Sequence, residues 1–236
     1  MPIYNEAANI GSVLREWFDC LDKVAPDFVL LAINDGSKDD TQTVLESLGS
    51  ELGPRLRVVS KPNSGHGSSC REGYELALAA GAHWIFQIDS DGQCDPADFP
   101  KLLAALSEHD LVVGYRVRRA DHWIRRAMSR AFRTVHRLLF PVRLRDPSCP
   151  YLIIRRPALE RVLRGQVGIL KQGFWWEFVA RAVGCGLRVV EVPVQHRVRK
   201  AGTTQVYWPR RVPRIALEHL VGLVRLRREL RHGAAR

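Results

Sequence analysis

The strongest constraint on the fold is an alternation of short apolar runs with amphipathic stretches along the first half of the chain. Runs at 28–33, 56–60, 83–89 and 110–115 indicate strands, and the segments between them have helical spacing, as in residues 6–22. This alternation predicts an α/β fold with a mainly parallel central sheet flanked by helices. Further strands are predicted at 151–156 and 187–194, with helices at 120–139, at 173–184 and from Val212 onward.

Polar loops follow three of the predicted strands, at 34–41, 61–69 and 89–95. Ligands of open α/β sheets bind beyond the carboxyl ends of the strands. We therefore expect these three loops to line one crevice.

Charge is divided unevenly along the chain, whose net charge is +11. Residues 1–110 hold 18 acidic and 8 basic side chains, whereas residues 111–236 hold 7 acidic and 28 basic ones. A basic half favours an anionic partner. The candidates are a nucleic acid, a phosphate group and an acidic membrane surface.

The cysteine content and the hydropathy pattern bear on the compartment. The 5 cysteines are odd in number and lack metal-ligand spacing, no signal peptide precedes the first polar motif, and no stretch is apolar enough to span a bilayer. We therefore expect a reduced, cytoplasmic protein.

Two carboxylates stand at the end of an apolar run. The first ends "WIFQID", and the second is in "SDGQ", which follows it directly. Asp89 and Asp91 are two residues apart, so in extended chain they point the same way. Carboxylates this close repel each other unless a cation or a proton lies between them. Their oxygens suit Mg²⁺ or Mn²⁺, to which Gln93 adds a neutral carbonyl oxygen. The alternative is a solvated turn that caps the helix beginning at Pro96.

Six motifs in a fixed order make the interpretation more specific. They are "PIYNEAANI" at 2–10, "NDGSKDDT" at 34–41, "NSGHGSSCREG" at 63–73, "DSDGQCDP" at 89–96, "VGYR" at 113–116 and "EVPV…R..G" at 191–202. Together they resemble the family-2 glycosyltransferases and, within them, the dolichol-phosphate mannose synthase branch. The resemblance implies a GT-A fold in residues 1–205, with a donor half of about 1–110 and an acceptor half of about 111–205. Residues 206–236 would form a separate basic, amphipathic C-terminal helix.

The resemblance also implies an activity. It is inverting, metal-dependent transfer of a sugar from a nucleotide-diphosphate donor, GDP-mannose or a UDP-sugar, to a polyprenyl phosphate such as a dolichyl or undecaprenyl phosphate. The expected cofactor is Mg²⁺ or Mn²⁺. The expected location is peripheral, at the inner, cytoplasmic face of an anionic membrane surface, with no nucleic acid as partner.

The resemblance further assigns residues to roles. The nucleotide sugar would contact the residues Pro2, Tyr4, Asn5, Glu6, Asp35, Gly65, His66, Asp89, Ser90 and Asp91. The metal would be held by Asp89, Asp91 and Gln93, and the catalytic carboxylates would be Asp91 and Asp146. The acceptor phosphate would be surrounded by Arg116, Ser129, Arg130 and Arg199.

The sequence departs from the family pattern at several points. Most relatives have an apolar strand before P-x-Y-N-E, so we expect the first strand of the sheet to be missing. Asn34 replaces the usual first Asp of D-D-G-S, and Cys149, Pro150 and Tyr151 follow Ser148 where relatives have G-F after the serine. Thr204-Gln205 replaces the common S-K and removes one expected cation.

Several residues and the overall class keep alternative interpretations. Glu177 is either an acceptor-site carboxylate or a buried, paired one, and the last helix is either a core helix or an interfacial membrane helix. A family-2 enzyme acting on a soluble or polysaccharide acceptor would show the same motifs. A nucleic-acid-binding protein would explain the basic half, but the chain has no recognisable base-reading motif. A nucleotidyltransferase would need a Gly-rich phosphate loop that "PIYNEAANIG" does not provide.

Overall fold

The computed structural model describes residues 1–117, 123–164, 173–198 and 212–233. Its strands are β1 (Pro2–Ile3), β2 (Leu30–Asp35), β3 (Leu56–Lys61), β4 (Trp84–Gln87), β5 (Leu111–Arg116), β6 (Leu152–Arg155) and β7 (Val189–Val194). Its α-helices are α1 (Ile10–Val24), α2 (Thr41–Leu52), α3 (His66–Ala79), α4 (Phe99–Ala105), α5 (Trp123–Leu139), α6 (Arg156–Leu163), α7 (Phe174–Gly184) and α8 (Val212–Gly233). Short 3₁₀ turns lie at η1 (Gly53–Arg55) and η2 (Pro96–Asp98).

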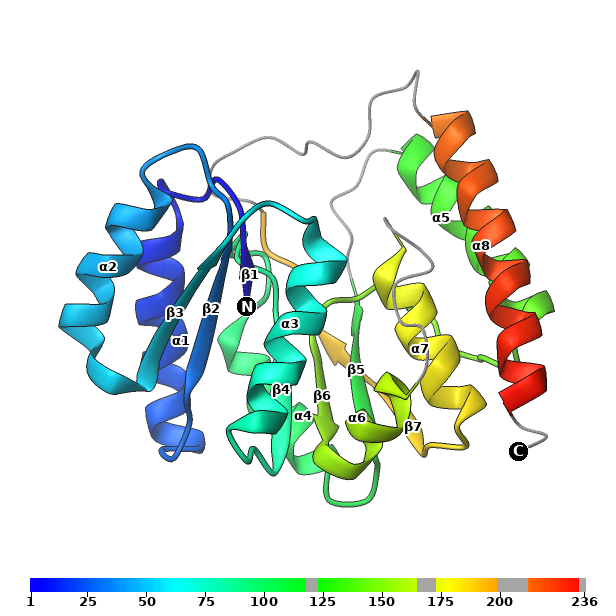
Figure 1. Ribbon diagram of the computed structural model, residues 1–236. Coiled ribbons are helices and arrows are strands. Elements are labelled where there is room, and N and C mark those ends of the chain that lie inside the picture. The colour runs from blue at the N-terminus through cyan, green and yellow to red at the C-terminus, as the bar shows by residue number, and fades with distance from the viewer. Residues whose placement is uncertain (118–122, 165–172, 199–211, 234–236) are drawn as a thin grey trace.

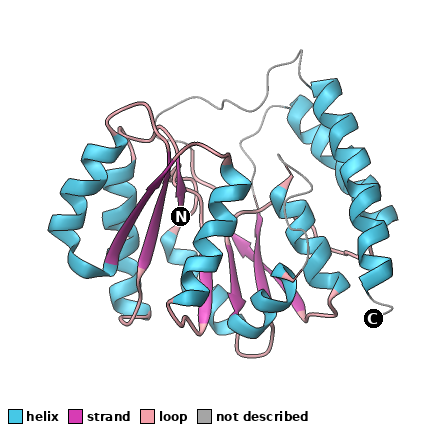
Figure 2. Ribbon diagram, viewed as in Figure 1, coloured by secondary structure: helices cyan, strands magenta, loops and turns pink. Residues whose placement is uncertain are grey.

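The strands form two hydrogen-bonded groups. The first has the order β1-β2-β3 and is parallel throughout, and the second has the order β4-β6-β5-β7. In the second group β5 and β7 are parallel, whereas β6 runs antiparallel to both β4 and β5. The α/β class with mainly parallel strands and flanking helices is therefore confirmed (Figures 1 and 2). The reversed β6 was not predicted, because an apolar run carries no information about the direction in which the chain enters a sheet.

The strand expected to be missing is represented by β1. Its two residues pair in parallel with β2, so that Pro2 lies opposite Ile33 and Ile3 lies opposite Asn34. Both residues are buried. The edge of β2 is therefore covered, although by only two residues.

The predicted apolar face of α1 is the face that enters the core. Its buried residues are Ile10, Val13, Leu14, Trp17, Phe18 and Leu21. Trp17 packs against Phe86 of β4, with ring centroids 5.2 Å apart, and against Tyr151, at 5.8 Å. The helix begins at Ile10 rather than at residue 6, because the carbonyl of Glu6 accepts the N–H groups of Asn9 and Ile10 in a preceding turn.

Helices α5 and α8 lie side by side at the edge of the molecule remote from β1–β3 (Figure 1). Arg181 of α7 joins this layer to the core, because its guanidinium binds Glu177 at 2.9 Å and Glu229 of α8 at 2.9 Å. Glu177 is fully buried in this ion pair. Its interpretation as a buried, paired carboxylate therefore fits the structure. No helix in the described part of the chain is both long and apolar enough to cross a membrane.

Candidate functional site

The carboxylate pair lies in a tight turn directly after β4. The turn requires glycine at position 92, because its φ is 71°. A Cβ atom of any other residue at this position would also lie only 3.2 Å from the side chain of Val13. The backbone N–H of Gln93 donates to Asp91 Oδ1 at 3.1 Å. The Gln93 side-chain nitrogen donates to the carbonyl of Arg197 at 3.3 Å, so the amide oxygen is the atom left to face a cation.

A pocket of about 160 Å³ opens beside this turn. Asp89, Asp91 and Gln93 line one part of it, and Arg116 and Ser148 line another. The remaining lining residues are Cys94, Cys149, Pro150, Tyr151, Trp175, Val194, Gln195 and His196. The pocket therefore brings acidic groups from the first half of the chain and a guanidinium from the second half to one space.

His66 binds the first carboxylate of the pair. Its Nε2 lies 3.0 Å from Asp89 Oδ1, and its ring packs edge-on against Trp175 with centroids 5.9 Å apart. Desolvation opposes a charged imidazole, but Cys70 and the hydrogen-bonded Asp89 carboxylate outweigh it and raise the pKa of His66 well above its usual value. His66 is therefore an imidazole held against the carboxylate that lies at the proposed metal and diphosphate position.

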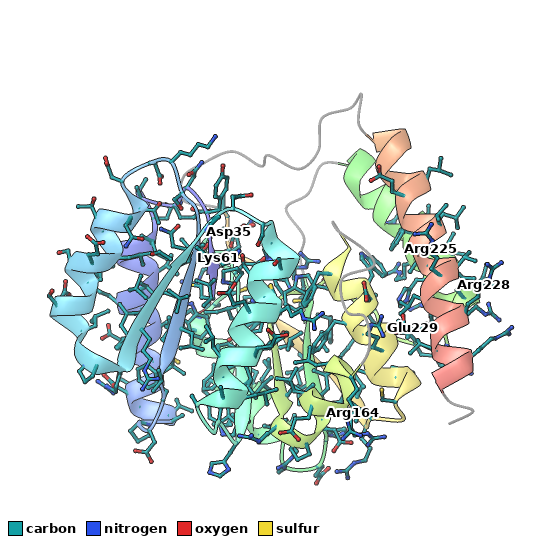
Figure 3. All side chains as sticks on the ribbon, viewed as in Figure 1. Asp35, Lys61, Arg164, Arg225, Arg228 and Glu229 are labelled. Atoms are coloured by element: carbon teal, nitrogen blue, oxygen red, sulfur yellow. The ribbon has the colours of Figure 1, made fainter. Side chains whose placement is uncertain are left out.

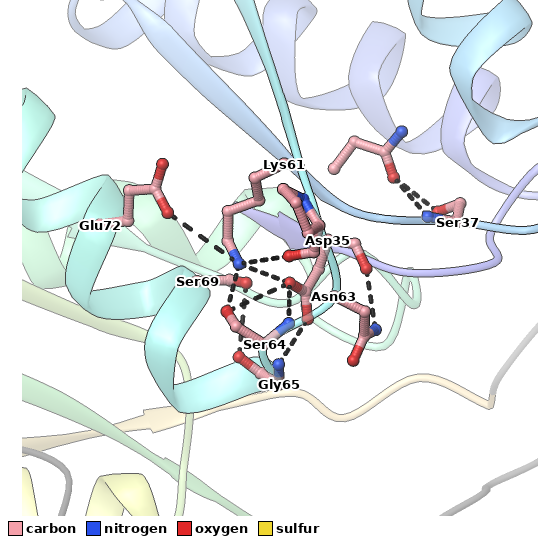
Figure 4. Close-up of polar contacts among 10 residues, drawn as sticks. Asp35, Ser37, Lys61, Asn63, Ser64, Gly65, Ser69 and Glu72 are labelled. Carbon is pink, nitrogen blue, oxygen red and sulfur yellow. Dashed lines mark hydrogen bonds and ion pairs between the residues drawn. The ribbon is translucent and has the colours of Figure 1, made fainter.

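Asp35 occupies the centre of a hydrogen-bond network at the carboxyl end of β2 (Figure 4). Lys61 Nζ donates to Asp35 Oδ1 at 2.6 Å, and the backbone N–H groups of Ser64 and Gly65 donate to its two oxygens at 2.9 Å each. Desolvation alone would raise the pKa of Asp35, but Lys61 and the two N–H groups lower it. The carboxylate thus holds the 63–65 loop, which leads directly to His66 and from there to Asp89.

The N-terminal motif wraps around the same edge. Asn5 adopts a φ of 54°, its N–H donates to Ser37 Oγ at 3.0 Å, and its Oδ1 accepts the N–H of Lys38 at 2.8 Å. The N–H of Glu6 donates to Thr41 Oγ1 at 2.9 Å, and the side chain of Glu6 is buried. Tyr4 is exposed. The motif therefore fixes the loop after β2 and leaves an aromatic ring at the surface beside it.

Arg116, at the end of β5, forms a two-pronged ion pair with Asp146. Its Nε donates to Asp146 Oδ2 at 2.6 Å and its Nη2 donates to Oδ1 at 2.8 Å. Nη2 also donates to Ser148 Oγ at 2.9 Å. Both side chains of the pair are about nine-tenths buried. Arg116 lines the pocket, whereas Asp146 does not and lies behind Arg116.

The other predicted residues are placed as follows. Ser90 is buried and does not line the pocket. Arg130 is exposed on α5. Arg199 and the side chain of Ser129 lie outside the described residues. The structure thus brings Asp89, Asp91, Gln93 and Arg116 to one pocket, with His66 against Asp89.

Several lining residues were not predicted. Trp175 and His196 line the pocket, although the sequence motifs assigned them no role in it. The only available signal was that Trp175 is the first residue of "WWEF" and that His196 follows "EVPV" by two residues. That signal could not have found the site, because both segments reach it only through the packing of α7 and β7.

The chemistry of the donor set can be tested for its fit to a divalent cation. The described ranges contain no group of three or more His, Cys, Asp or Glu side chains arranged to bind a metal. Two carboxylates and an amide oxygen form an incomplete, all-oxygen set, which suits a Mg²⁺ or Mn²⁺ ion that also binds waters and a substrate diphosphate. The residues present fit such a shared ion.

The fold defines the class of the protein. It is a GT-A fold, and a solved structure of this kind is glucosyl-3-phosphoglycerate synthase from Mycobacterium tuberculosis in complex with Mn²⁺ and UDP-glucose. That structure is similar with a TM-score of 0.62 at 17% identity, over 95% of this chain and 76% of the other. The Glycosyl transferase family 2 model matches residues 1–163. The chain belongs to glycosyl transferase family 2 and is a glycosyltransferase.

Curated relatives cover most of the chain. A polyprenol monophosphomannose synthase of Mycolicibacterium smegmatis is 27% identical over 87% of this chain and 79% of its own length. An uncharacterised glycosyltransferase of Mycobacterium tuberculosis is 32% identical, over 87% of each chain. An undecaprenyl-phosphate mannosyltransferase of Micrococcus luteus is 25% identical over 87% of this chain and 85% of its own length. The predicted resemblance to enzymes of the polyprenyl-phosphate mannose synthase kind is confirmed.

Proposed function

We propose that the protein transfers a sugar from a nucleotide-diphosphate donor to a polyprenyl phosphate, with inversion at the anomeric carbon. The observation that carries the proposal is the pocket in which Asp89 and Asp91 share one space with Arg116. The names of the polyprenol and undecaprenyl-phosphate relatives support the acceptor class.

The donor side follows from the chemistry of the leaving group. Asp89, Asp91 and the amide oxygen of Gln93 would hold Mg²⁺ or Mn²⁺, and the bound cation would neutralise charge on the departing diphosphate. The nucleotide would lie along the carboxyl ends of β1–β3, where the N-terminal motif meets the loop held by Asp35. Gly65 and His66 connect the proposed nucleotide position to the proposed metal position at Asp89. Gly65 lies at the start of α3, where backbone N–H groups favour phosphate.

The acceptor side follows from charge. A phosphate monoester is already an oxyanion, so the enzyme needs to position it rather than to deprotonate it. Its approach to a diphosphate is opposed by repulsion between the negative charges, which the positive charge of a nearby guanidinium relieves. Arg116 supplies this group, with Asp146 behind it and Ser148 beside it in the pocket lining. We assign Asp146 the role of Arg116's partner beside the reaction site.

Helix α8 is suited to an anionic membrane surface. It exposes Leu217, Leu220, Val221 and Val224, which are between 36% and 63% accessible. Arg225 and Arg228 extend from the same helix (Figure 3). Exposed apolar side chains with neighbouring arginines are typical of helices that lie in a membrane interface. We propose that α8 holds the enzyme at the cytoplasmic face, where a lipid phosphate is within reach.

The direct test is a donor panel. The protein is incubated with GDP-mannose or with UDP-sugars, with Mg²⁺ or Mn²⁺, and with undecaprenyl phosphate in vesicles, and sugar transfer to lipid is measured. Parallel reactions offer a soluble phosphate monoester or a polysaccharide instead. Transfer to the lipid supports the proposal, whereas transfer only to a soluble or polysaccharide acceptor would contradict it.

A further inference from the structure

The segment 144–146, which carries Asp146, is clamped from two sides. On one side, Glu191 of β7 accepts two consecutive backbone N–H groups: that of Arg145 at 2.6 Å on Oε2 and that of Asp146 at 2.8 Å on Oε1. On the other side, Arg133 donates to the carbonyl of Arg145 at 2.6 Å. Both faces of this short peptide are therefore occupied by charged side chains.

The arginine contacts change the interpretation of α5. Arg137, one turn after Arg133, donates to the carbonyl of Leu144 at 2.9 Å. Both arginines belong to the basic second half of the chain, for which an anionic partner was expected. In the structure they hold backbone carbonyls of the 144–146 segment.

The strand register connects the clamp to the pocket. Glu191 lies opposite Val113, and Arg116 lies opposite Val194, in the parallel pair β5–β7. Arg116 and the side chain that orients the 144–146 segment thus come from the same two paired strands. A contact path runs from Glu191 to the backbone of Asp146, from its carboxylate to Arg116, and from there to the pocket.

We infer that Glu191 is a positioning residue for the acceptor-side guanidinium, which it fixes through the backbone of Asp146. The inference rests on the proposed function for its consequence in catalysis. Glu191 itself does not line the pocket. It acts because an Asp146 carboxylate that can shift lets the Arg116 guanidinium rotate, and a rotated guanidinium no longer presents its positive charge to an acceptor phosphate in the pocket.

The chemistry of the clamp requires a carboxylate. Burial raises the pKa of Glu191, while the two N–H donors partly offset this cost. Two adjacent N–H groups need two acceptor atoms. A glutamine keeps the shape but offers one oxygen, and its NH₂ group faces an N–H donor. The Glu191→Gln variant therefore loosens one end of the clamp with little change in volume.

A purely structural role for Glu191 makes different predictions from a positioning role. A structural role lowers stability and reduces all activities together. A positioning role acts on Arg116 and on the acceptor, and leaves the donor alone. The chain offers a matched control in Asp110, whose carboxylate accepts the N–H of Arg188 at 2.9 Å at the opposite end of the β5–β7 pair.

The first experiment observes Arg116 directly. The side-chain Nε–H signals of ¹⁵N-arginine-labelled protein are recorded by NMR, and that of Arg116 is identified by its loss in Arg116→Lys. Glu191→Gln should shift or broaden this signal, and Asp110→Asn should leave it in place. An unchanged Arg116 signal in folded Glu191→Gln would overturn the inference, whatever the acceptor proves to be.

The second experiment measures transfer to polyprenyl phosphate. Glu191→Gln should raise the KM for the acceptor about tenfold, the effect of weakening one charge-assisted hydrogen bond. Donor hydrolysis without acceptor should stay within about twofold of the wild type, because the donor site is untouched. Glu191→Asp keeps both oxygens on a shorter side chain. Its acceptor KM should lie between that of the wild type and that of Glu191→Gln.

A double-mutant cycle tests whether Glu191 acts through Arg116. In an Arg116→Lys background, Glu191→Gln should change the acceptor KM less than about twofold, since the guanidinium is already gone. Full additivity would contradict the inference. If the wild type transfers no sugar to any polyprenyl phosphate, the proposed function fails by itself, and the NMR signal of Arg116 still decides the positioning role.

Discussion

Lys61 Nζ lies 2.6 Å from Asp35 Oδ1, and both side chains are at least nine-tenths buried. The same Lys61 also binds Ser64 Oγ, and the backbone of Gly65 binds the other oxygen of Asp35 (Figure 4). One ion pair therefore joins the ends of β2 and β3 to the start of α3. Asp35 was expected to contact the nucleotide base or ribose, and in the structure its carboxylate shapes the loop beside that proposed position.

Asp35→Ala should destabilise the protein by about 3 kcal/mol, because it leaves the buried Lys61 ammonium with only the more distant Glu72, at 4.0 Å, as a counter-ion among the described residues. Lys61→Met should also destabilise it, and the double variant should lose less than the sum of the two. Urea unfolding measures all three. Additive losses would show that the two side chains do not interact. Nucleotide affinity should fall in Asp35→Ala as well, since the 63–65 loop loses its anchor.

Asp91→Asn should reduce sugar transfer on the order of 1000-fold, because the neutral amide cannot neutralise a divalent cation beside the diphosphate. The amide oxygen can still accept the N–H of Gln93, so the turn should persist. Titration calorimetry with Mn²⁺ and the nucleotide diphosphate checks the metal directly. The control Asp22→Asn changes an exposed carboxylate that pairs with Arg55 and does not line the pocket, and it should retain most activity. Normal activity of Asp91→Asn in a chelator would refute the metal role.

His136 of α5 should make stability depend on pH. Burial lowers its pKa to about 4, and its Nε2 lies 3.0 Å from the carbonyl of Trp176, so Nε2 carries the hydrogen and Nδ1 has no hydrogen-bond partner among the described residues. Between pH 6.5 and about 4 the unfolded chain therefore binds a proton that the folded chain does not. The free energy of unfolding should fall by up to about 3 kcal/mol as the pH drops through this window.

The pH effect is isolated by comparison. His136→Gln can still donate to the Trp176 carbonyl but does not titrate, so its stability should vary less over the same window. The exposed His83→Gln variant should keep the wild-type dependence. Equal slopes for all three proteins in urea unfolding at pH 4.5 to 7 would rule out His136 as the source.

Helix α8 should bind anionic membranes through its exposed side chains. A Leu220→Glu and Val221→Glu double variant should reduce flotation with vesicles that contain phosphatidylglycerol, by about tenfold in partition coefficient, because both apolar contacts are lost and two negative charges are added. Arg228→Glu should weaken the same binding and reduce its dependence on salt. Zwitterionic vesicles serve as the control. Wild-type flotation of the double variant would exclude α8 as the contact surface.

Sequence patterns predicted the parts of the site that are local in the chain. The DxD turn, its place after a buried strand and the loops at the ends of β2 and β3 follow from apolar periodicity and turn-forming residues, which act over a few positions. The order of the six motifs is by itself sufficient to indicate the family. The apolar face of α1 was also predicted residue by residue, since helical periodicity determines which side chains share a face.

Pairings between distant residues were decided by the tertiary structure. Nothing in the sequence joins Arg116 to Asp146, His66 to Asp89 or Glu191 to the backbone of Arg145, because each contact depends on which strands pair and in which register. The antiparallel β6 and the packing of α7 bring Ser148 and Trp175 to the pocket in the same way. The sequence by itself determined which residue types stand at the ends of strands and which family the chain resembles. Only the tertiary structure decided which charges neutralise each other, because the energy of a charge pair depends on distance and burial.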